Sequence, residues 1–494
     1  MEATQYKEKA GSIFKRPVVW FYGIGSIAYG IKNNAFSYLL LIFANQVLGI
    51  PAVYASLALA IAMLWDAMSD PLIGHWSDKT NSALGRRHPF MYASLAIFPL
   101  SFFALFTPVI TVSAEDALLF GMSSAWWYVL VLAILIRTAT TLFEVPNSAL
   151  LPELENDYDR RNSWLMLRHG FGWWGGNGYH CINFFFFLGT WGYVSHTGYS
   201  VYGTVGAIII ALVIIISATG TQKVASSFPR PRETFKFSAI YTEVKQIVES
   251  VWDRNFAAIF FYGLISAIAG GLGTALYIYL TAYFFAFSPV QVATTAIFVM
   301  LSPFFAARII PFLAARFEKK YVCMASGLFF IVVYPMPYLM VLAGFWPELG
   351  STTSLIIYTV FIVIEVTGLV VNGSLRDSMI ADIVENREIK TNRRSEGLFF
   401  AFTGFAAKAT SGGGIIAAGS IITLAGMDNV RDVAQMTMEI RTDLIALFLP
   451  IYLTLQILGL LCVMMYRITR DQHNANLSAL AGRKADTLAA ESSA

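Results

Sequence analysis

Charged residues are scarce in this chain of 494 residues, where Asp, Glu, Lys and Arg together make up 13% of the sequence. Ordinary soluble domains carry about a quarter. Hydrophobic residues make up 56% and aromatic residues 15%, which leaves little polar surface for contact with water. The net charge of +3 gives no reason to expect nucleic acid as a partner. The composition therefore predicts a protein embedded in a lipid bilayer.

Cysteine is also rare, and motifs of catalysis are missing. Cys181, Cys323 and Cys462 lie in apolar runs at unrelated spacings, which argues against a disulfide framework or a zinc site. The glycine run at 412–414 lies in an apolar segment and lacks the spacing of a phosphate-binding loop. No paired-histidine metal motif and no nucleophile motif occurs in the sequence. We therefore expect a protein that is not an enzyme and has no cofactor.

Long apolar runs, by contrast, are abundant, and twelve of them can cross a bilayer as a helix. They lack the alternation of barrel strands, so we predict an all-α membrane protein with twelve transmembrane helices. The expected spans are 17–45, 51–74, 88–110, 125–150, 163–189, 200–220, 255–286, 289–314, 321–344, 353–377, 397–425 and 444–467.

Basic residues set the expected orientation. Outside the spans, nearly all of the 34 Lys and Arg residues lie in the tails and in loops after even-numbered spans, and only Arg431 and Arg441 follow odd-numbered spans. The positive-inside rule then predicts both termini in the cytoplasm. The expected domains are a cytoplasmic tail at 1–16, a six-helix bundle at 17–220, a cytoplasmic linker with an amphipathic helix at 221–254, a six-helix bundle at 255–467 and a cytoplasmic tail at 468–494.

A weak internal repeat indicates that the two six-helix halves are pseudo-symmetric. Residues 148–156 follow the fourth span and read Ser-Ala-Leu-Leu-Pro-Glu-Leu-Glu-Asn, whereas residues 378–386 follow the tenth span and read Ser-Met-Ile-Ala-Asp-Ile-Val-Glu-Asn. Each segment runs into a pair of arginines. Two parallel halves related by an axis along the membrane normal are a known transporter arrangement.

Acidic side chains inside two spans predict a cation site. Asp66 and Asp70 lie one helical turn apart in span 51–74 and share a face. A carboxylate in a bilayer costs from about 2.5 to more than 10 kcal/mol unless a cation, a proton or a basic partner satisfies it. Glu144 lies at a similar depth in span 125–150, and Ser69 and Thr141 add hydroxyl oxygens. We predict a monovalent cation, such as Na⁺, held by the three carboxylates.

Two other interpretations of the acids stay open. A shared proton would relieve the repulsion between like charges, which makes H⁺ an alternative to Na⁺ as the coupling ion. Alternatively, Asp70 and Pro71 end their helix and Glu144 pairs with Arg137, although this leaves Asp66 unexplained.

Basic and polar side chains within the spans predict the substrate contacts. A buried Lys or Arg needs an anion or a water-filled cavity, and Lys408 lies too deep to reach the surface. Arg168 could instead extend to the cytoplasm, Lys32 could form a structural ion pair, and Trp173 could serve helix packing. The expected contacts are Lys32, Asn33, Asn34, Arg168, Trp173 and Lys408.

Charged loops on the expected cytoplasmic side suggest a gate. Loop 74–89 carries Asp78 and the pair Arg86 and Arg87. Their charges could form ion pairs between loops that break and reform as the halves rock. We expect the same role for Asp382 and Arg394 in the second half.

These motifs resemble those of a known family. The string Trp65-Asp66-x-x-x-Asp70-Pro71-x-x-Gly74, followed by Gly85-Arg86-Arg87-x-Pro89, is similar to the signature of glycoside–pentoside–hexuronide:cation symporters. These form the melibiose-permease-like branch of the major facilitator superfamily. The resemblance covers essentially the whole chain. It implies the major facilitator fold and cation-coupled sugar symport by alternating access, with the protein in a bacterial inner membrane as a monomer.

The resemblance also implies roles for single residues. Asp66 and Asp70 fall on the family's cation-binding carboxylates, and Ser69 and Thr141 fall on its auxiliary cation ligands. Glu144 falls on an acid between the cation and sugar sites.

The remaining assignments and departures bear on the substrate. Arg168 falls on a sugar-contacting arginine, and Lys408 falls on a lysine that links the halves near the site. Galactoside members carry an aspartate in span 1, where this chain has Lys32, and an aromatic residue where it has Ser148. A lysine in place of an acid favours an anionic solute such as a uronate or an acidic glycoside. The family is also similar to vertebrate Na⁺-coupled lysolipid carriers, so a lysolipid or other amphiphile is the alternative substrate.

Overall fold

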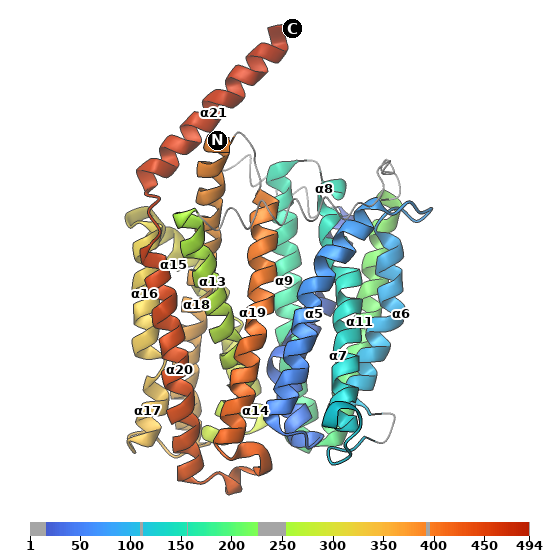
Figure 1. Ribbon diagram of the computed structural model, residues 1–494, viewed down its shortest axis with the longest axis vertical. Coiled ribbons are helices and arrows are strands. Elements are labelled where there is room, and N and C mark those ends of the chain that lie inside the picture. Colours follow the sequence, from blue (N-terminus) through green and yellow to red (C-terminus); the bar gives the residue numbers. More distant parts are fainter. Residues whose placement is uncertain (1–15, 109–111, 156, 226–252, 392–395, 494) are drawn as a thin grey trace.

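The computed structural model describes residues 16–108, 112–155, 157–225, 253–391 and 396–493. Its long helices run side by side along one axis, and the last helix projects beyond one end of the bundle (Figure 1). The amphipathic helix predicted at 238–252 and the predicted gate residue Arg394 lie outside the described residues.

In the first half of the chain, helices occupy most of each predicted span. Its elements are α2 (Pro17–Ile24), α3 (Ser26–Asn34), η1 (Ala35–Leu39), α4 (Leu40–Ile42), η2 (Phe43–Val47), α5 (Ala52–Lys79), α6 (His88–Phe106), η3 (Leu119–Gly121), α7 (Ser124–Ala149), α8 (Leu151–Leu154), α9 (Tyr158–Ile182), η4 (Asn183–Phe187), α10 (Leu188–Trp191) and α11 (His196–Ala225).

The second half repeats this pattern. Its elements are α13 (Arg254–Ile278), η5 (Tyr279–Phe284), α14 (Pro289–Val299), α15 (Ser302–Arg316), α16 (Lys319–Val333), α17 (Met336–Leu342), α18 (Thr352–Thr391), α19 (Glu396–Leu424), η6 (Met427–Asn429), η7 (Val433–Gln435), α20 (Met438–Met464) and α21 (Arg470–Ser493).

Helix length and hydropathy agree with a membrane bundle. Ten helices in the described part of the chain are long and apolar enough to cross a bilayer. The two other predicted spans, 17–45 and 163–189, are also mainly helical. Short π-helical segments interrupt the α-helix of the first span, and one follows the α-helix of the second. The all-α fold predicted from the sequence is therefore confirmed.

Some helix ends differ from the expected bounds. The tenth span was expected to end at 377, yet α18 continues to Thr391. The spans at 289–314 and 321–344 each consist of two helices, because a proline lies at the break, as Pro335 does between α16 and α17. The tail expected at 468–494 forms the helix α21.

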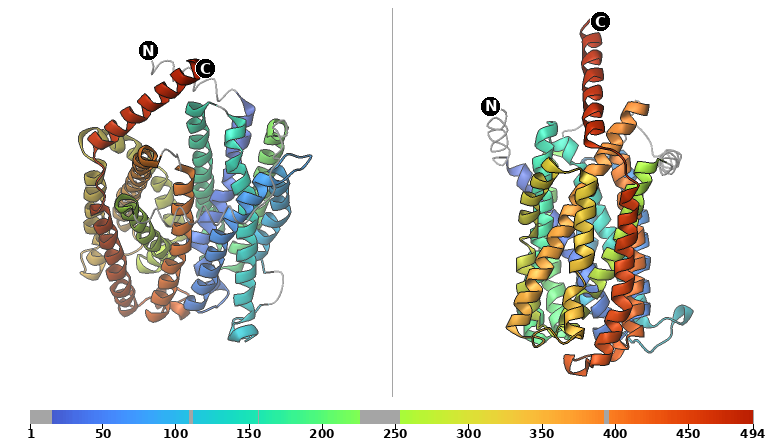
Figure 2. Two further views of the ribbon diagram at one scale, coloured as in Figure 1. Left: turned by 45° about the horizontal axis from the view of Figure 1, so that its top comes forward. Right: turned by 90° about the vertical axis from the view of Figure 1, so that its left-hand side faces the viewer.

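The two ends of the bundle differ in what they carry. The start of α2, the connection 80–87 and the helix α21 lie at one end, which we call the terminal face (Figure 2). The connections 112–123 and 425–437 lie at the opposite end, which we call the far face (Figure 1).

The halves pack against each other where α5 meets α19, where α9 meets α14 and where η1 meets α13. Small residues bring α19 close to α5. A Cβ atom on Gly412 would lie 3.4 Å from Ala60, and one on Gly419 would overlap Ser56 and the carbonyl of Ala52. This close approach lets a side chain of one half reach carboxylates of the other.

Candidate cation and substrate site

The helix α5 carries both predicted aspartates on one face. It runs without a break through Pro71 to Lys79, so the interpretation in which Asp70 and Pro71 end the helix is wrong. Because residues four apart share a helix face, Asp66 and Asp70 point to the same side. Asp66 is 3% exposed, and the carboxylate of Asp70 is also mostly covered.

Hydroxyl groups of α5 and α7 complete an oxygen-rich cluster. Thr141 Oγ1 lies 2.8 Å from Asp70 Oδ1 and 3.5 Å from Asp66 Oδ1. Ser69 Oγ lies 3.5 Å from Thr141 Oγ1. The structure thus brings four of the five predicted cation ligands together. We call these four residues the carboxylate cluster.

Two basic side chains hold the carboxylate cluster. Arg137 of α7 donates to Asp66 Oδ2 at 3.1 Å, and both side chains are almost fully buried. Lys408 of α19 donates to Asp70 Oδ2, and its Nζ lies 3.4 Å from Asp66 Oδ2. The ammonium group of Lys408 therefore bridges both aspartates and ties the second half to the first.

Glu144, the fifth predicted ligand, has a different partner. It pairs with Arg168 of α9, and its second oxygen is buried. The alternative pairing of Glu144 with Arg137 is wrong, because Arg137 binds Asp66. Glu144 lies one turn along α7 from Thr141, so its role as a third ligand of the same ion stays a prediction.

The other predicted substrate contacts lie on α3 and α9, which pack together. Lys32 is 3% exposed, and its Nζ lies 5.2 Å from the ring centre of Tyr29. Asn34 Nδ2 donates to Asn177 Oδ1 at 3.3 Å. Asn33 is exposed and Trp173 is half-buried.

The predicted gate residues form ion pairs within each half. Arg87 donates to Asp78 at 3.0 Å and lies 2.9 Å from Glu153, the acid that follows α7. Arg86 also donates to Glu153, at 2.8 Å. In the second half, Lys319 donates to both oxygens of Asp382, at 2.7 and 2.8 Å.

These pairs repeat with the internal symmetry of the chain. In each half a basic residue at the start of the third long helix binds an acid near the end of the fourth: Glu153 follows α7, whereas Asp382 lies in the part of α18 beyond the predicted span. His473 of α21 lies 3.2 Å from Asp382 and 2.8 Å from Glu385, so the last helix is docked on α18.

The far face is closed by hydrogen bonds between the halves. Asp428 Oδ1 accepts from the backbone N–H of Ala52 at 2.8 Å and from Asn45 Nδ2 at 2.9 Å. Arg431 donates to Gln46 Oε1 at 2.9 Å. These bonds join the loop before α20 to the end of the first span and the start of α5.

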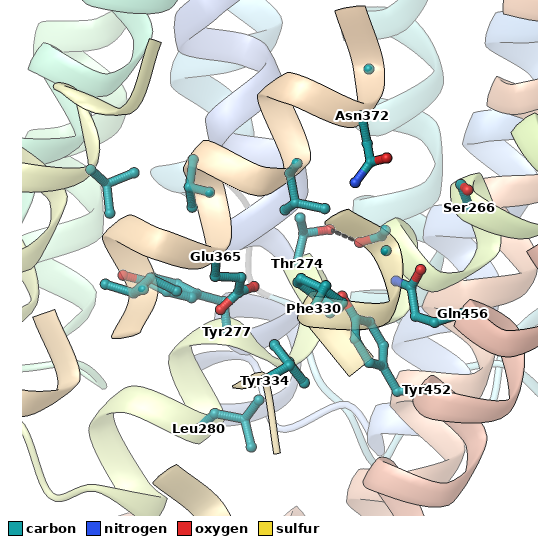
Figure 3. A pocket seen from close by; sticks show the side chains of 18 of the residues that line it. Ser266, Thr274, Tyr277, Leu280, Phe330, Tyr334, Glu365, Asn372, Tyr452 and Gln456 are labelled. Atoms are coloured by element: carbon teal, nitrogen blue, oxygen red, sulfur yellow. Dashed lines mark hydrogen bonds between the residues drawn. The ribbon is translucent and has the colours of Figure 1, made fainter. Parts of the chain in front are cut away.

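A cavity of 270 Å³ lies mainly in the second half (Figure 3). Residues of α13, α16, α18 and α20 line it, and Tyr38, Asn177 and His180 border it from the first half. Glu365 of α18 projects into it.

Glu365 is not among the site residues expected from the sequence. The signal that marked Asp66 was present here too, because Glu365 is an acid within the apolar run 353–377.

A second cavity, of 440 Å³, adjoins the first and is mostly apolar. It lies between α15, α16, α17 and α18, and Glu365 lines both cavities. Side chains such as Phe305 and Phe329 line it, and both are exposed. The second cavity is therefore not completely filled by side chains of the protein.

Comparison with known proteins adds the family. Residues 21–470 match the model of the family described as MFS/sugar transport protein. The isoprimeverose transporter of Lactiplantibacillus pentosus is 24% identical over 435 residues, which are 86% of this chain and 84% of that protein. A D-xylose-proton symporter of known structure has a TM-score of 0.63 at 12% identity and covers 91% of this chain and 97% of its own. That likeness shows the fold alone, with the two six-helix halves of major facilitator proteins.

Part of the chain is also similar to a relative that is named for a different kind of solute. The sodium-dependent lysophosphatidylcholine symporter 1 of Xenopus tropicalis is 32% identical over 144 residues, which are 29% of this chain and only 26% of that protein. The matched family and both of these relatives are transporters, so the expectation that the chain is not an enzyme is confirmed.

Proposed function

Because the chain belongs to the MFS/sugar transport protein family, we propose that it couples the movement of Na⁺ or H⁺ to the uptake of a sugar-like solute that carries an anionic group. The observation that carries this proposal is the ammonium of Lys408 on Asp66 and Asp70. A positive group attached to the chain occupies the place that a free cation would take between two carboxylates.

In this proposal the free cation and Lys408 compete for the same oxygens. A Na⁺ ion on the carboxylate cluster would displace the ammonium, because both cannot be coordinated by Asp66 Oδ2 and Asp70 Oδ2 at once. The displaced Lys408 would lose its link to α5 and would turn toward the solute. Binding of the cation and binding of the solute would then favour each other by the same factor.

In this proposal, the closed far face indicates which way the site faces. The hydrogen bonds between the halves at Asp428 and Arg431 close that face. The positive-inside rule assigns the terminal face to the cytoplasm. In the proposed cycle this structure is the inward-facing, cation-free carrier in which Lys408 has replaced the ion.

The charges around the site support an anionic solute. Asp66, Asp70 and Glu144 face four basic groups, which are Lys32, Arg137, Arg168 and Lys408. One positive charge is left over in a poorly hydrated environment, where an anion of the solute would balance it. Lys32 is the member of this set for which the structure shows a ring contact rather than an ion pair.

The test is a panel of neutral sugars and uronates, measured by thermal shift and by uptake into proteoliposomes with and without Na⁺. We expect uronates to raise the Tm only with the cation present. Asp66→Ala and Asp70→Ala should abolish cation-stimulated uptake, whereas Asp116→Ala, in an exposed loop, should not. Cation-dependent accumulation in either cluster variant at the wild-type level would contradict the proposal.

The second cavity favours an amphiphile as the second candidate substrate. Its volume of 440 Å³ and its phenylalanine-rich wall suit a hydrocarbon chain better than a sugar. Lysophosphatidylcholine in the same panel distinguishes the two candidates. A Na⁺-dependent stabilisation by the lysolipid, with none by sugars or uronates, would select the amphiphile.

A further inference from the structure

Glu365 lies near the middle of α18, in the sequence Phe-Ile-Val-Ile-Glu-Val at 361–366. Its side chain projects into the 270 Å³ cavity, where Figure 3 shows it among the lining residues. Glu365 has no role in the cation binding proposed for the carboxylate cluster. An ionisable side chain at such a place in a membrane helix indicates a functional site.

The walls around this carboxyl group are aromatic. Seven tyrosines line the same cavity as Glu365, and they come from both halves of the chain: Tyr38, Tyr262, Tyr277, Tyr334, Tyr338, Tyr358 and Tyr452.

In the described part of the chain, the structure shows no ion pair for Glu365. Arg376 lines the same cavity, but its guanidinium lies 3.2 Å from Asp377. The carboxyl group of Glu365 therefore faces the cavity without a cation of the chain beside it. This differs from Asp66, Asp70 and Glu144, which all have basic partners.

We propose that this cavity binds an organic ammonium group of the solute, with Glu365 as its counter-ion and the tyrosine rings around it. Aromatic rings attract alkylated ammonium groups through their faces, and the attraction grows when water is excluded. An inorganic cation usually binds several carboxylate or carbonyl oxygens, whereas Glu365 is the one carboxylate among the residues that line this cavity. Glu365, Tyr334, Tyr338 and Tyr358 also line the apolar cavity, which would take a hydrocarbon part of the same solute.

This inference rests on the second candidate of the proposed function, the amphiphile, because it names a second charged group of that solute. The anionic group would face the surplus positive charge near Lys32, and the ammonium would face Glu365. The solute is then a zwitterion that spans the two halves.

The experiment compares two probes of equal shape on the purified full chain in lipid nanodiscs. Choline carries a quaternary ammonium, and 3,3-dimethylbutan-1-ol is its neutral carbon isostere. Measured by thermal shift in a Na⁺-free potassium buffer, choline should bind at least about tenfold more tightly than the isostere. Tetramethylammonium should share this preference.

Substitutions of Glu365 test whether this residue causes the preference for choline over its isostere. Glu365→Gln should remove it, and Glu365→Asp, which keeps the charge, should retain most of it. Glu439→Gln is the matched control, because Glu439 is an exposed acid at the start of α20. Equal binding of choline and the isostere by the wild-type chain would overturn the proposal, and so would a choline preference that survives in Glu365→Gln.

The design separates this inference from the proposed coupling. If Glu365→Gln fails to fold, the wild-type comparison and Glu365→Asp still decide the outcome. The choline preference should persist in Asp70→Asn, since Asp70 lies on α5 in the other half. Loss of cation-stimulated uptake without loss of choline binding would therefore concern only the carboxylate cluster.

Discussion

Thr141 shows how a single hydroxyl can serve an ion site. Its oxygen lies 2.8 Å from Asp70 Oδ1 and 3.0 Å from the carbonyl oxygen of Arg137. It has one proton to donate, so it bonds one of these oxygens at a time and keeps lone pairs for a cation. In the proposed cycle, Thr141 donates to Asp70 when the ion is absent and coordinates the ion when it is present.

Removing this hydroxyl should weaken cation binding without harming the helix. We expect Thr141→Val to lower the apparent affinity for the coupling cation about fivefold, the equivalent of about 1 kcal/mol for one hydrogen-bonding group. The Na⁺ dependence of the Tm measures it. Thr140→Val is the control, because Thr140 bonds only the carbonyl of Ile136 within its own helix. An equal loss in both variants would contradict a role for Thr141 in the site.

The buried ion pair between Glu144 and Arg168 can also be tested by changing single residues. Both side chains are largely buried, so a single Arg168→Gln change leaves an unpaired carboxylate and should destabilise the fold by about 3 kcal/mol. The double variant Glu144→Gln with Arg168→Gln removes both charges and should recover much of the Tm. A double variant as unstable as the single one would show that the charge pair is not the cause.

The acidic residues of the site were predictable from the sequence, whereas the residues that pair with them were less so. Asp66 and Asp70 are predictable because their cost in a bilayer is visible in the sequence alone. The partner of Glu144 was not predictable. Arg137 and Glu144 lie seven positions apart, which is about 10 Å along one helix, so each pairs with a neighbouring helix instead. Such pairings follow from the packing of helices, which spacing within one span does not specify.

At the scale of elements, glycines decide how closely helices approach. Gly414 of α19 faces α13, where an added Cβ would overlap the carbonyl oxygen of Ile268 and lie 2.6 Å from Leu272 N. Gly30 of α3 has the same relation to Gly176 of α9. Small residues at such crossings are typical of helix packing in membranes.

The neighbouring residues Gly413 and Gly414 allow a test of this close packing. Gly414→Ala should push α13 away and lower the Tm, with a cost of about 2 kcal/mol for overpacking. Gly413→Ala should be neutral or slightly stabilising, because a Cβ there meets nothing within 4 Å. Thermal unfolding of both variants in the same detergent is the measurement. A Gly413 variant that is less stable than the Gly414 variant would contradict the packing argument.

The sequence predicted the helices more accurately than their irregularities. The apolar runs located every span, since length and hydropathy suffice for that. The π-helical segments at 35–39, 43–47, 183–187 and 279–284 have no comparable pattern in the sequence. They lie in or next to the first, fifth and seventh spans. A π-helical turn inside an α-helix is rare and depends on its surroundings in the fold.

For the whole molecule, closure of the far face sets which side the site faces. Asp428 holds the first half through two hydrogen bonds, to Ala52 and Asn45. Loss of these bonds should weaken the closed state relative to the state that is open at the far face.

A cysteine at Ser56, which is buried where α5 meets α19, reports on this opening. In a chain whose three cysteines are replaced, Asp428→Ala should speed labelling of Ser56→Cys about a hundredfold, because two bonds to a charged group are lost and each contributes about 1.5 kcal/mol. Asp432→Ala is the control, since Asp432 only caps the short helix η7 in the same loop. Faster labelling in the Asp432 variant than in the Asp428 variant would refute the assignment.

In the proposed cycle, Lys408 gives the cation-free carrier a counter-ion that is part of the chain and cannot diffuse away. The two aspartates would therefore keep a positive partner at any concentration of the coupling ion. The cation-free carrier could then reorient without exposing an unpaired carboxylate to the bilayer interior, which a carrier with a neutral residue at this place could not do.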